Sequence, residues 1–109
     1  MSADQQLAVF LGDKILAQAH VSDLTHVEGN WYFPDHALVD RGRYTQSETT
    51  THCPWKGDAG YYNYKSDDGE IKDIAWFYPT PKNGAEEVEG RVAFYIGKVP
   101  GLRTGDPPV

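Results

Sequence analysis

The chain has 109 residues and a mass of 12.2 kDa, a length typical of one domain with one hydrophobic core. Acidic residues outnumber basic residues by 16 to 10, and the net charge of −6 argues against nucleic-acid and membrane partners, whose surfaces are anionic. Aromatic residues reach 13% of the composition, so rings supply much of the buried area, which favours a sheet.

The start of the chain gives no sign of export or membrane insertion. No stretch approaches the roughly 20 apolar residues of a spanning helix, and residues 1–6 lack the basic start and apolar run of a secretory signal. We therefore expect a soluble, cytoplasmic protein with a flexible start over residues 1–6 and one β domain over residues 7–99. The single cysteine, Cys53, has no partner for an internal disulfide, so stability must come from packing.

Turn residues separate short apolar or aromatic runs in the first half of the chain, a pattern typical of strands. Residues 7–11 and 15–19 flank a short loop with a glycine, which predicts a hairpin. Residues 31–33 predict a strand that ends at Pro34, because proline lacks the backbone donor. Residues 34–42 are expected to be irregular.

The second half continues the same pattern. Residues 43–52 are rich in threonine and poor in apolar side chains, and they predict a half-solvated strand. Residues 60–65 and 71–78 enclose an Asp-Gly turn, the strongest hairpin signal in the chain. Residues 84–89 predict one helical turn, and residues 91–96 predict a last strand.

These elements predict an all-β fold of mainly antiparallel sheets. Residues 100–109 are rich in proline and glycine, and we expect a mobile tail with little to pack. The motifs THCPWKGDAGYY, DIAWFYPTP and EGRVAFYIGKV, in this order and spacing, resemble the family catalogued as domain of unknown function 427, sometimes labelled nucleotidyltransferase-like. The resemblance extends from about Ala8 to Val99. It implies a compact, mostly antiparallel domain with a partly aromatic concavity, and a family without an established reaction.

The residues argue against metal-dependent nucleotidyl transfer, which needs paired carboxylates for divalent cations and a glycine-rich turn for the triphosphate. Asp67 and Asp68 are the only adjacent aspartates, and they lie in the predicted hairpin turn. Residues 55–58, WKGD, lack the glycines before the lysine and the Ser or Thr after it that a P-loop requires. We expect no cofactor and no metal site, since the histidines and Cys53 show no ligand spacing.

Cys53 has two interpretations. A catalytic thiol needs a base or a cation nearby, and His52 is a poor base because neighbouring side chains in a strand point to opposite faces. Lys56 supplies a cation if the chain turns after Pro54. Free cysteines are also among the residues most often buried, so a structural role stays open.

The segment that contains Cys53 is the best candidate for a binding site. Gly57 and Gly60 allow the backbone to approach a bound group, Lys56 offers a positive charge, and aromatic residues flank all three. This combination predicts a pocket for a small anionic or planar ligand around residues 51–62. The predicted ligand-binding residues are Cys53, Trp55, Lys56, Asp58, Tyr61, Tyr62 and Trp76.

Three functions remain open on these residues. A ligand-binding domain predicts a concavity around Lys56 with Cys53 buried. An enzyme using Cys53 with Lys56 or His52, in thiol, transfer or hydrolytic chemistry, predicts an exposed thiol with a base within hydrogen-bond reach. A protein-interaction module predicts a flat apolar patch or an open strand edge. The ligand, the oligomeric state and any reaction do not follow from the sequence.

Overall fold

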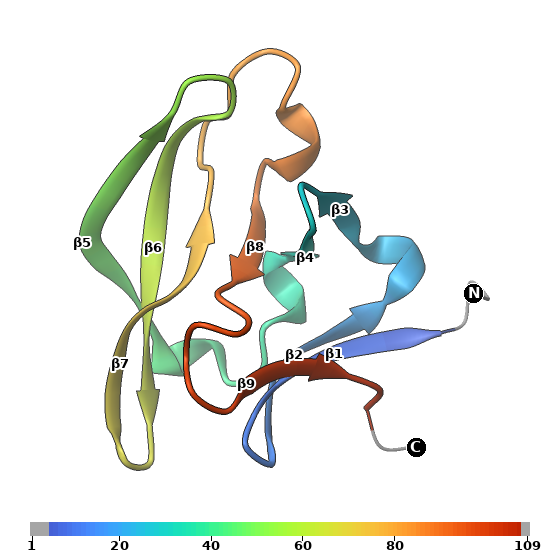
Figure 1. The fold of residues 1–109 in the computed structure, drawn as a ribbon, viewed down its shortest axis with the longest axis vertical. Helices are drawn as coiled ribbons and strands as arrows, with labels where there is room; N and C mark the ends of the chain where they lie inside the picture. The colour runs from blue at the N-terminus through green and yellow to red at the C-terminus, as the bar shows by residue number, and fades with distance from the viewer. Residues whose placement is uncertain (1–4, 108–109) are drawn as a thin grey trace.

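The computed structural model describes residues 5–107, which form nine strands and four short 3₁₀ turns (Figure 1). The strands are β1 (Gln6–Leu11), β2 (Lys14–His20), β3 (Thr25–Val27), β4 (Asn30–Pro34), β5 (Tyr44–Cys53), β6 (Gly57–Ser66), β7 (Gly69–Phe77), β8 (Arg91–Phe94) and β9 (Leu102–Gly105). The 3₁₀ turns are η1 (Val21–Asp23), η2 (Asp35–Ala37), η3 (Arg41–Arg43) and η4 (Glu86–Val88). The predicted all-β fold is confirmed. None of the helical segments in this range has the length or hydropathy to cross a membrane.

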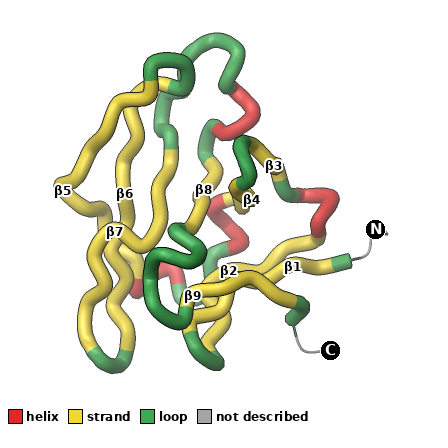
Figure 2. Tube along the Cα trace, in the orientation of Figure 1, coloured by secondary structure: helices red, strands yellow, loops and turns green. Residues whose placement is uncertain are grey.

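The strands form two antiparallel sheets. The small sheet has the order β2-β1-β9, and the large sheet has the order β3-β4-β8-β7-β6-β5. The long strands β5, β6 and β7 form one wall of the molecule, and β2, β1 and β9 lie together at the opposite end (Figures 1 and 2). The pairs β1–β2, β3–β4, β5–β6 and β6–β7 are hairpins, and β8 lies between β4 and β7 and connects the two halves of the large sheet.

The predicted hairpins are confirmed. Strands β6 and β7 pair with Ser66 opposite Gly69, so the two aspartates form the turn, and β1 pairs with β2 with Leu11 opposite Lys14. Strand β4 ends at Pro34 and η4 supplies the expected helical turn. Strand β8 is shorter than predicted, because the chain leaves the sheet after Phe94.

Strands β3 and β9 have no counterpart among the predicted strands. Strand β9 lies in the segment expected to be a tail, yet Leu102 is only 4% exposed and pairs with Leu11 of β1. This strand, LRTG, has a single apolar residue, so it carries no alternation that predicts a strand. The expectations for residues 1–4 and 108–109 lie outside the described residues.

The large sheet packs on both faces. One face, here called the sheet–sheet face, packs against the small sheet, and its buried cluster is Val9, Leu16, Ala17, Phe33, Ala37, Leu38, Tyr44, Tyr64, Ile74, Ala75, Val92, Phe94 and Leu102. The other, here called the tyrosine face, has the buried cluster Val27, Tyr32, Ala59, Tyr61, Trp76, Tyr78, Val88 and Ala93. Adjacent residues such as Tyr32 and Phe33 are divided between the two faces, because side chains alternate along a strand.

Candidate functional site

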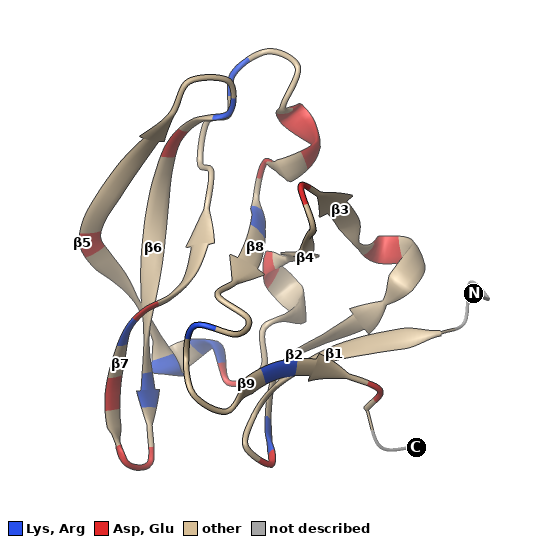
Figure 3. Ribbon diagram, viewed as in Figure 1, with Lys and Arg blue, Asp and Glu red and all other residues tan. Residues whose placement is uncertain are grey.

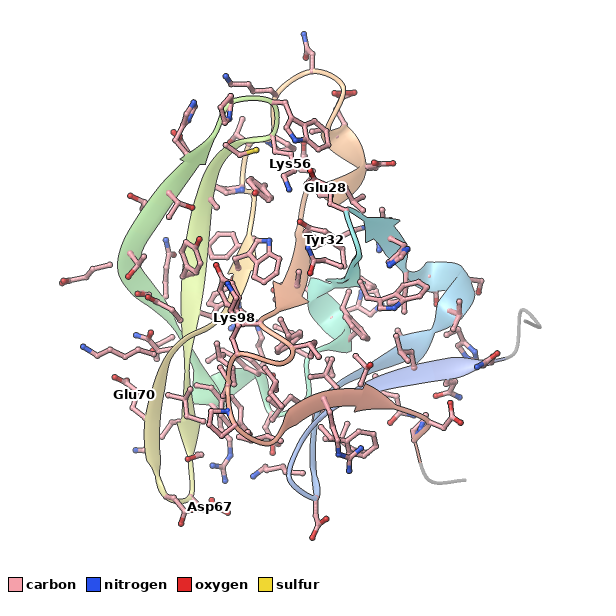
Figure 4. All side chains as sticks on the ribbon, viewed as in Figure 1. Glu28, Tyr32, Lys56, Asp67, Glu70 and Lys98 are labelled. Carbon is pink, nitrogen blue, oxygen red and sulfur yellow. The ribbon has the colours of Figure 1, made fainter. Side chains whose placement is uncertain are left out.

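A pocket of about 330 Å³ opens on the tyrosine face. Its aromatic walls come from different elements: Tyr61 from β6, Trp76 from β7, Tyr78 just after β7, and Tyr95 just after β8. Lys56 and Lys98 also line the pocket, and Asn30, Phe94 and Ile96 complete its lining. In Figure 4, Lys56 lies at one end of this face beside Glu28, and Lys98 extends from the loop that joins β8 to β9.

The register of the large sheet places the aromatic rings beside one another. Tyr61 lies opposite Trp76, and Trp76 lies opposite Ala93 on the next strand. Because Ala93 ends at its methyl group, space remains beside Trp76, where the Tyr95 ring packs with its centroid 4.5 Å from that of Trp76. The rings of Tyr61 and Tyr95 are parallel within 3°, with centroids 6.1 Å apart. The pocket wall therefore consists of ring faces and edges.

The polar ends of these rings bond to one another. Trp76 Nε1–H donates to the Tyr32 hydroxyl at 3.2 Å, and the Tyr95 hydroxyl donates to the Tyr61 oxygen at 3.2 Å. The Tyr61 hydroxyl also lies 2.9 Å from Thr51 Oγ1. Burial, with the Tyr61 hydrogen bond added, raises the pKa of Tyr95, so this tyrosine is neutral at physiological pH. The network fixes the rings without placing a charge among them.

Lys56 is the one charged residue whose side chain is buried among the described residues, with 7% of the residue exposed. It lies in the turn between β5 and β6, its ammonium donates to the Glu28 carboxylate, and its Nζ is 5.3 Å from the ring centroids of Trp55 and Tyr78. Burial alone lowers the pKa of Lys56, but the hydrogen bond with Glu28 and the neighbouring tyrosines outweigh it and raise the pKa. The same hydrogen bond lowers the pKa of Glu28, so the pair is fully charged near neutral pH.

Glu28 occupies an unusual backbone position for a glutamate. Glu28 and Gly29 connect β3 to β4, and their φ angles are 53° and 80°, as in a two-residue type I′ turn. Asn, Asp and Gly are the residues that such positions favour, because other side chains are strained at positive φ. The turn thus holds a residue that its backbone disfavours, and that residue carries the carboxylate that binds Lys56.

Three of the predicted site residues, Lys56, Tyr61 and Trp76, line the pocket together. Trp55 is 44% exposed and does not line the pocket, although its ring centroid lies 5.3 Å from the Lys56 ammonium. Tyr62 lies on the sheet–sheet side of β6, where its ring stacks on Phe77 with centroids 4.5 Å apart. Successive residues of a strand face opposite ways, so Tyr61 and Tyr62 do not meet at one site.

The other two predicted residues do not line the pocket. Cys53 is partly exposed and packs against the cluster of the tyrosine face, and its sulfur makes no hydrogen bond within residues 5–107. Asp58 is exposed, and its carboxylate lies 2.7 Å from Nδ1 of His52, the residue directly opposite on β5. His52 is therefore engaged away from the thiol. In the described part of the chain, no group of three or more His, Cys, Asp or Glu side chains is placed to hold a metal ion.

Seven residues of the site were not predicted from the sequence: Glu28, Asn30, Tyr78, Phe94, Tyr95, Ile96 and Lys98. Tyr78 and Tyr95 belong to the aromatic motifs DIAWFYPTP and EGRVAFYIGKV, and the aromatic character of these motifs is a usable signal for them. Glu28 carries no such signal, because its role depends on a contact between two turns 28 residues apart.

The fold and the pocket define a small β domain with an aromatic, lysine-bearing pocket on one face of its large sheet. The family model described as Domain of unknown function (DUF427) matches residues 1–105. The chain belongs to this family, and the resemblance seen in its three motifs is confirmed. No curated protein matches the chain.

Proposed function

We propose that this protein binds a small planar molecule with a negative charge in the pocket of the tyrosine face. The observation that carries the proposal is the combination in one pocket of about 330 Å³ of five aromatic residues with two lysines. Small-molecule sites typically have volumes of roughly 300 to 1,000 Å³ and apolar walls with a few placed polar groups. The pocket lies at the low end of that range, which suits a ligand of one or two fused rings.

The aromatic walls support a planar ligand. The polar ends of Tyr61, Trp76 and Tyr95 are already hydrogen-bonded within the protein, so their ring faces and edges are what they offer to a bound molecule. An aromatic ring packed against such surfaces gains about 0.5–1.5 kcal/mol per ring pair beyond its buried area.

The lysines support a negative charge. The Lys56 ammonium has three N–H donors and uses one for Glu28, so donors remain for a ligand. Lys98 makes no ion pair within residues 5–107, and its Nζ lies 5.2 Å from the Tyr95 ring centroid. Figure 3 shows basic residues at the β5–β6 turn and in the β8–β9 loop, the two segments that supply these lysines. The pocket therefore has an excess of positive charge in a chain whose net charge is −6.

A matched pair of probes tests the proposal. Calorimetric titration with 2-naphthoate and with the neutral 2-naphthamide compares the same planar ring system with and without the charge. We expect naphthoate to bind more tightly, and Lys56→Met to weaken its binding about ten- to a hundredfold, since a charge-assisted hydrogen bond contributes roughly 1.5–3 kcal/mol. Lys98→Met, at an exposed position, is expected to weaken binding about two- to fivefold.

The control is Lys72→Met, which removes an exposed lysine of β7 that does not line the pocket. It corrects for the change in net charge and leaves naphthoate affinity unchanged if the effect is local. Equal affinities of the wild type and the Lys56→Met variant for naphthoate, or equal binding of the acid and the amide, would contradict the proposal.

A further inference from the structure

A second pocket of about 330 Å³ adjoins the first. Asn30, Phe94 and Ile96 line both pockets, so these three residues form the boundary between them. The boundary lies where β8 ends and the chain leaves the large sheet. Beyond it, the second pocket extends toward the small sheet, since Val9 of β1 and Thr104 of β9 are part of its lining.

The chemistry of the second pocket differs from that of the first. Its walls include the side chains of Val9, Trp31, Phe33, Phe94 and Ile96. Val9, Phe33 and Phe94 belong to the sheet–sheet cluster, so the pocket opens onto the main hydrophobic core. No charged side chain is among its lining residues in the described part of the chain.

The second pocket leaves apolar side chains at the edge of the core without partner atoms on their pocket side. Protein interiors contain few voids larger than a water molecule, because unfilled apolar walls lose dispersion contacts. Asn30, Thr104 and the indole N–H of Trp31 are the polar side-chain groups of the lining, and the other side chains are apolar. An apolar group entering the pocket restores the missing contacts without burying a charge. Ile96, which is 42% exposed, is the residue past which such a group enters.

We propose that the two pockets form one bipartite site, in which the second pocket holds an aliphatic branch of the ligand whose planar anionic part occupies the first. This inference rests on the proposed function and narrows the ligand class to planar acids with an alkyl substituent. The orientation follows from the charges. The acid group lies with Lys56 and Lys98, because burial of an unpaired charge among Val9, Phe33 and Phe94 is strongly unfavourable.

The test uses 2-naphthoate and its 6-alkyl homologues from methyl to hexyl, with affinities measured by calorimetry. Each methylene group that enters the second pocket is expected to raise the affinity by up to about fourfold. The gain is expected to stop when the pocket is full. If the affinity rises only because the probes become more hydrophobic, without a bounded pocket, the gain continues through the whole series.

Substitutions that fill the second pocket test whether the alkyl chain binds there. Thr104 is partly exposed on β9 and lines the second pocket but not the first. Thr104→Phe is expected to abolish the gain from the alkyl chain and to leave the affinity for 2-naphthoate itself unchanged. Thr104→Leu is the smaller substitution if phenylalanine disturbs the pairing of β9 with β1, and it is expected to shorten the useful chain. Thr45→Phe, at an exposed position of β5, is the matched control and leaves the whole series unchanged.

The outcomes separate the two proposals. If naphthoate binds in a Lys56-dependent way but alkyl chains add nothing, or add a gain that both Thr104 variants leave intact, the bipartite site is overturned and the proposed function stands. If neither naphthoate nor any homologue binds, both are overturned. If the homologues bind with a gain that Thr104→Phe abolishes, while Lys56→Met has no effect, the apolar subsite is supported and the proposed anionic site is overturned.

Discussion

The two faces of the large sheet use the same strands for different purposes. The sheet–sheet face is covered by a second sheet and is filled mainly by side chains without polar ends, such as Val9, Ile74 and Val92. The tyrosine face is covered by η4 and the turns around it instead of a sheet, and its rings carry hydroxyl and indole groups. Tyr32 and Phe33 are neighbours on β4, but Tyr32 packs on the tyrosine face and Phe33 on the sheet–sheet face, because side chains alternate along a strand.

This difference shows where a small domain has room for a binding site. The part of a face that a sheet seals must be packed to high density, because voids there lower stability, and the second pocket lies beside this part, where β8 ends. A face covered by turns allows a pocket, provided that its ring ends are hydrogen-bonded, as those of Trp76 and Tyr95 are. The stability of this protein should therefore depend mainly on the sheet–sheet face, and its binding on the tyrosine face.

The largest expected contrast is between two isoleucines. Ile74 is fully buried on the sheet–sheet face, and Ile74→Ala is expected to lower the free energy of unfolding by about 2–5 kcal/mol. Ile96 is 42% exposed at the pocket boundary, and Ile96→Ala is expected to cost less than about 1 kcal/mol. Denaturant unfolding of both variants measures the difference. Similar losses would show that the pocket boundary contributes to the core as much as the sealed face does.

A pair of glycines tests the packing of the sealed side more finely. A Cβ atom at Gly60 of β6 would lie 2.5 Å from Phe77 Cζ, and the Phe77 ring is held by its stack on Tyr62. Gly60→Ala is therefore expected to cost about 1–3 kcal/mol by forcing that stack apart.

Gly42 is the matched control for this substitution. A Cβ atom at Gly42 would meet no other atom within 4 Å, and the residue has no positive φ, so Gly42→Ala is expected to be neutral or to stabilise by up to about 1 kcal/mol. Unfolding midpoints of the two variants give the comparison. Equal midpoints would mean that Phe77 moves aside without loss.

The fold was predictable where the signal is local. The hairpins β1–β2 and β6–β7 follow from turn residues between apolar runs, and both signals lie within about 20 residues of sequence. Strand β9 was not predictable, because its pairing with β1 joins the two ends of the chain and its four residues show no alternation. Its neighbours in space, and not its composition, make it a strand.

The site was predictable to a similar degree. Lys56 and Tyr61 were predicted from the residues around Gly57 and Gly60, and strand alternation separates Tyr61 from its neighbour Tyr62. Glu28 has no local signal, since its turn position favours a different residue type and its partner is distant in sequence. Long-range contacts therefore decide which charges reach the pocket.

Alkaline pH tests whether the two faces unfold as one unit. Burial raises the pKa of Tyr44 on the sheet–sheet face and of Tyr95 beside the tyrosine face. The contribution of these two tyrosines to the free energy of unfolding is fully present below the ordinary tyrosine pKa of about 10. It is lost as pH rises from there toward the pKa that the tyrosines have in the folded protein, because the unfolded chain releases these protons first. The free energy of unfolding should fall above about pH 10, by up to about 1.4 kcal/mol per pH unit for each such tyrosine.

Tyr44→Phe and Tyr95→Phe separate the contributions of the two faces. The Tyr44 hydroxyl donates to the Leu16 carbonyl at 2.8 Å, and that carbonyl keeps the Val39 N–H as a second donor, so Tyr44→Phe is expected to cost only about 1 kcal/mol at neutral pH. In each variant, the free energy of unfolding should fall less steeply at alkaline pH, because the unfolded chain releases about one proton fewer. Tyrosinate absorbance that rises before unfolding in one variant only would show that the faces open separately.

The smallest expected change in stability is at Glu28, where backbone preference and charge oppose each other. Glu28→Asn places a residue that favours positive φ in the turn and removes the carboxylate partner of Lys56, so its unfolding midpoint should stay close to that of the wild type. Glu28→Gln removes the same charge but keeps the backbone strain, so it should unfold at a lower denaturant concentration than Glu28→Asn. Both variants free a donor of the Lys56 ammonium and should raise naphthoate affinity about two- to fivefold, with naphthamide unchanged. A fall in naphthoate affinity in both would instead mean that Glu28 positions Lys56 for the ligand, because the lost charge by itself favours an anion.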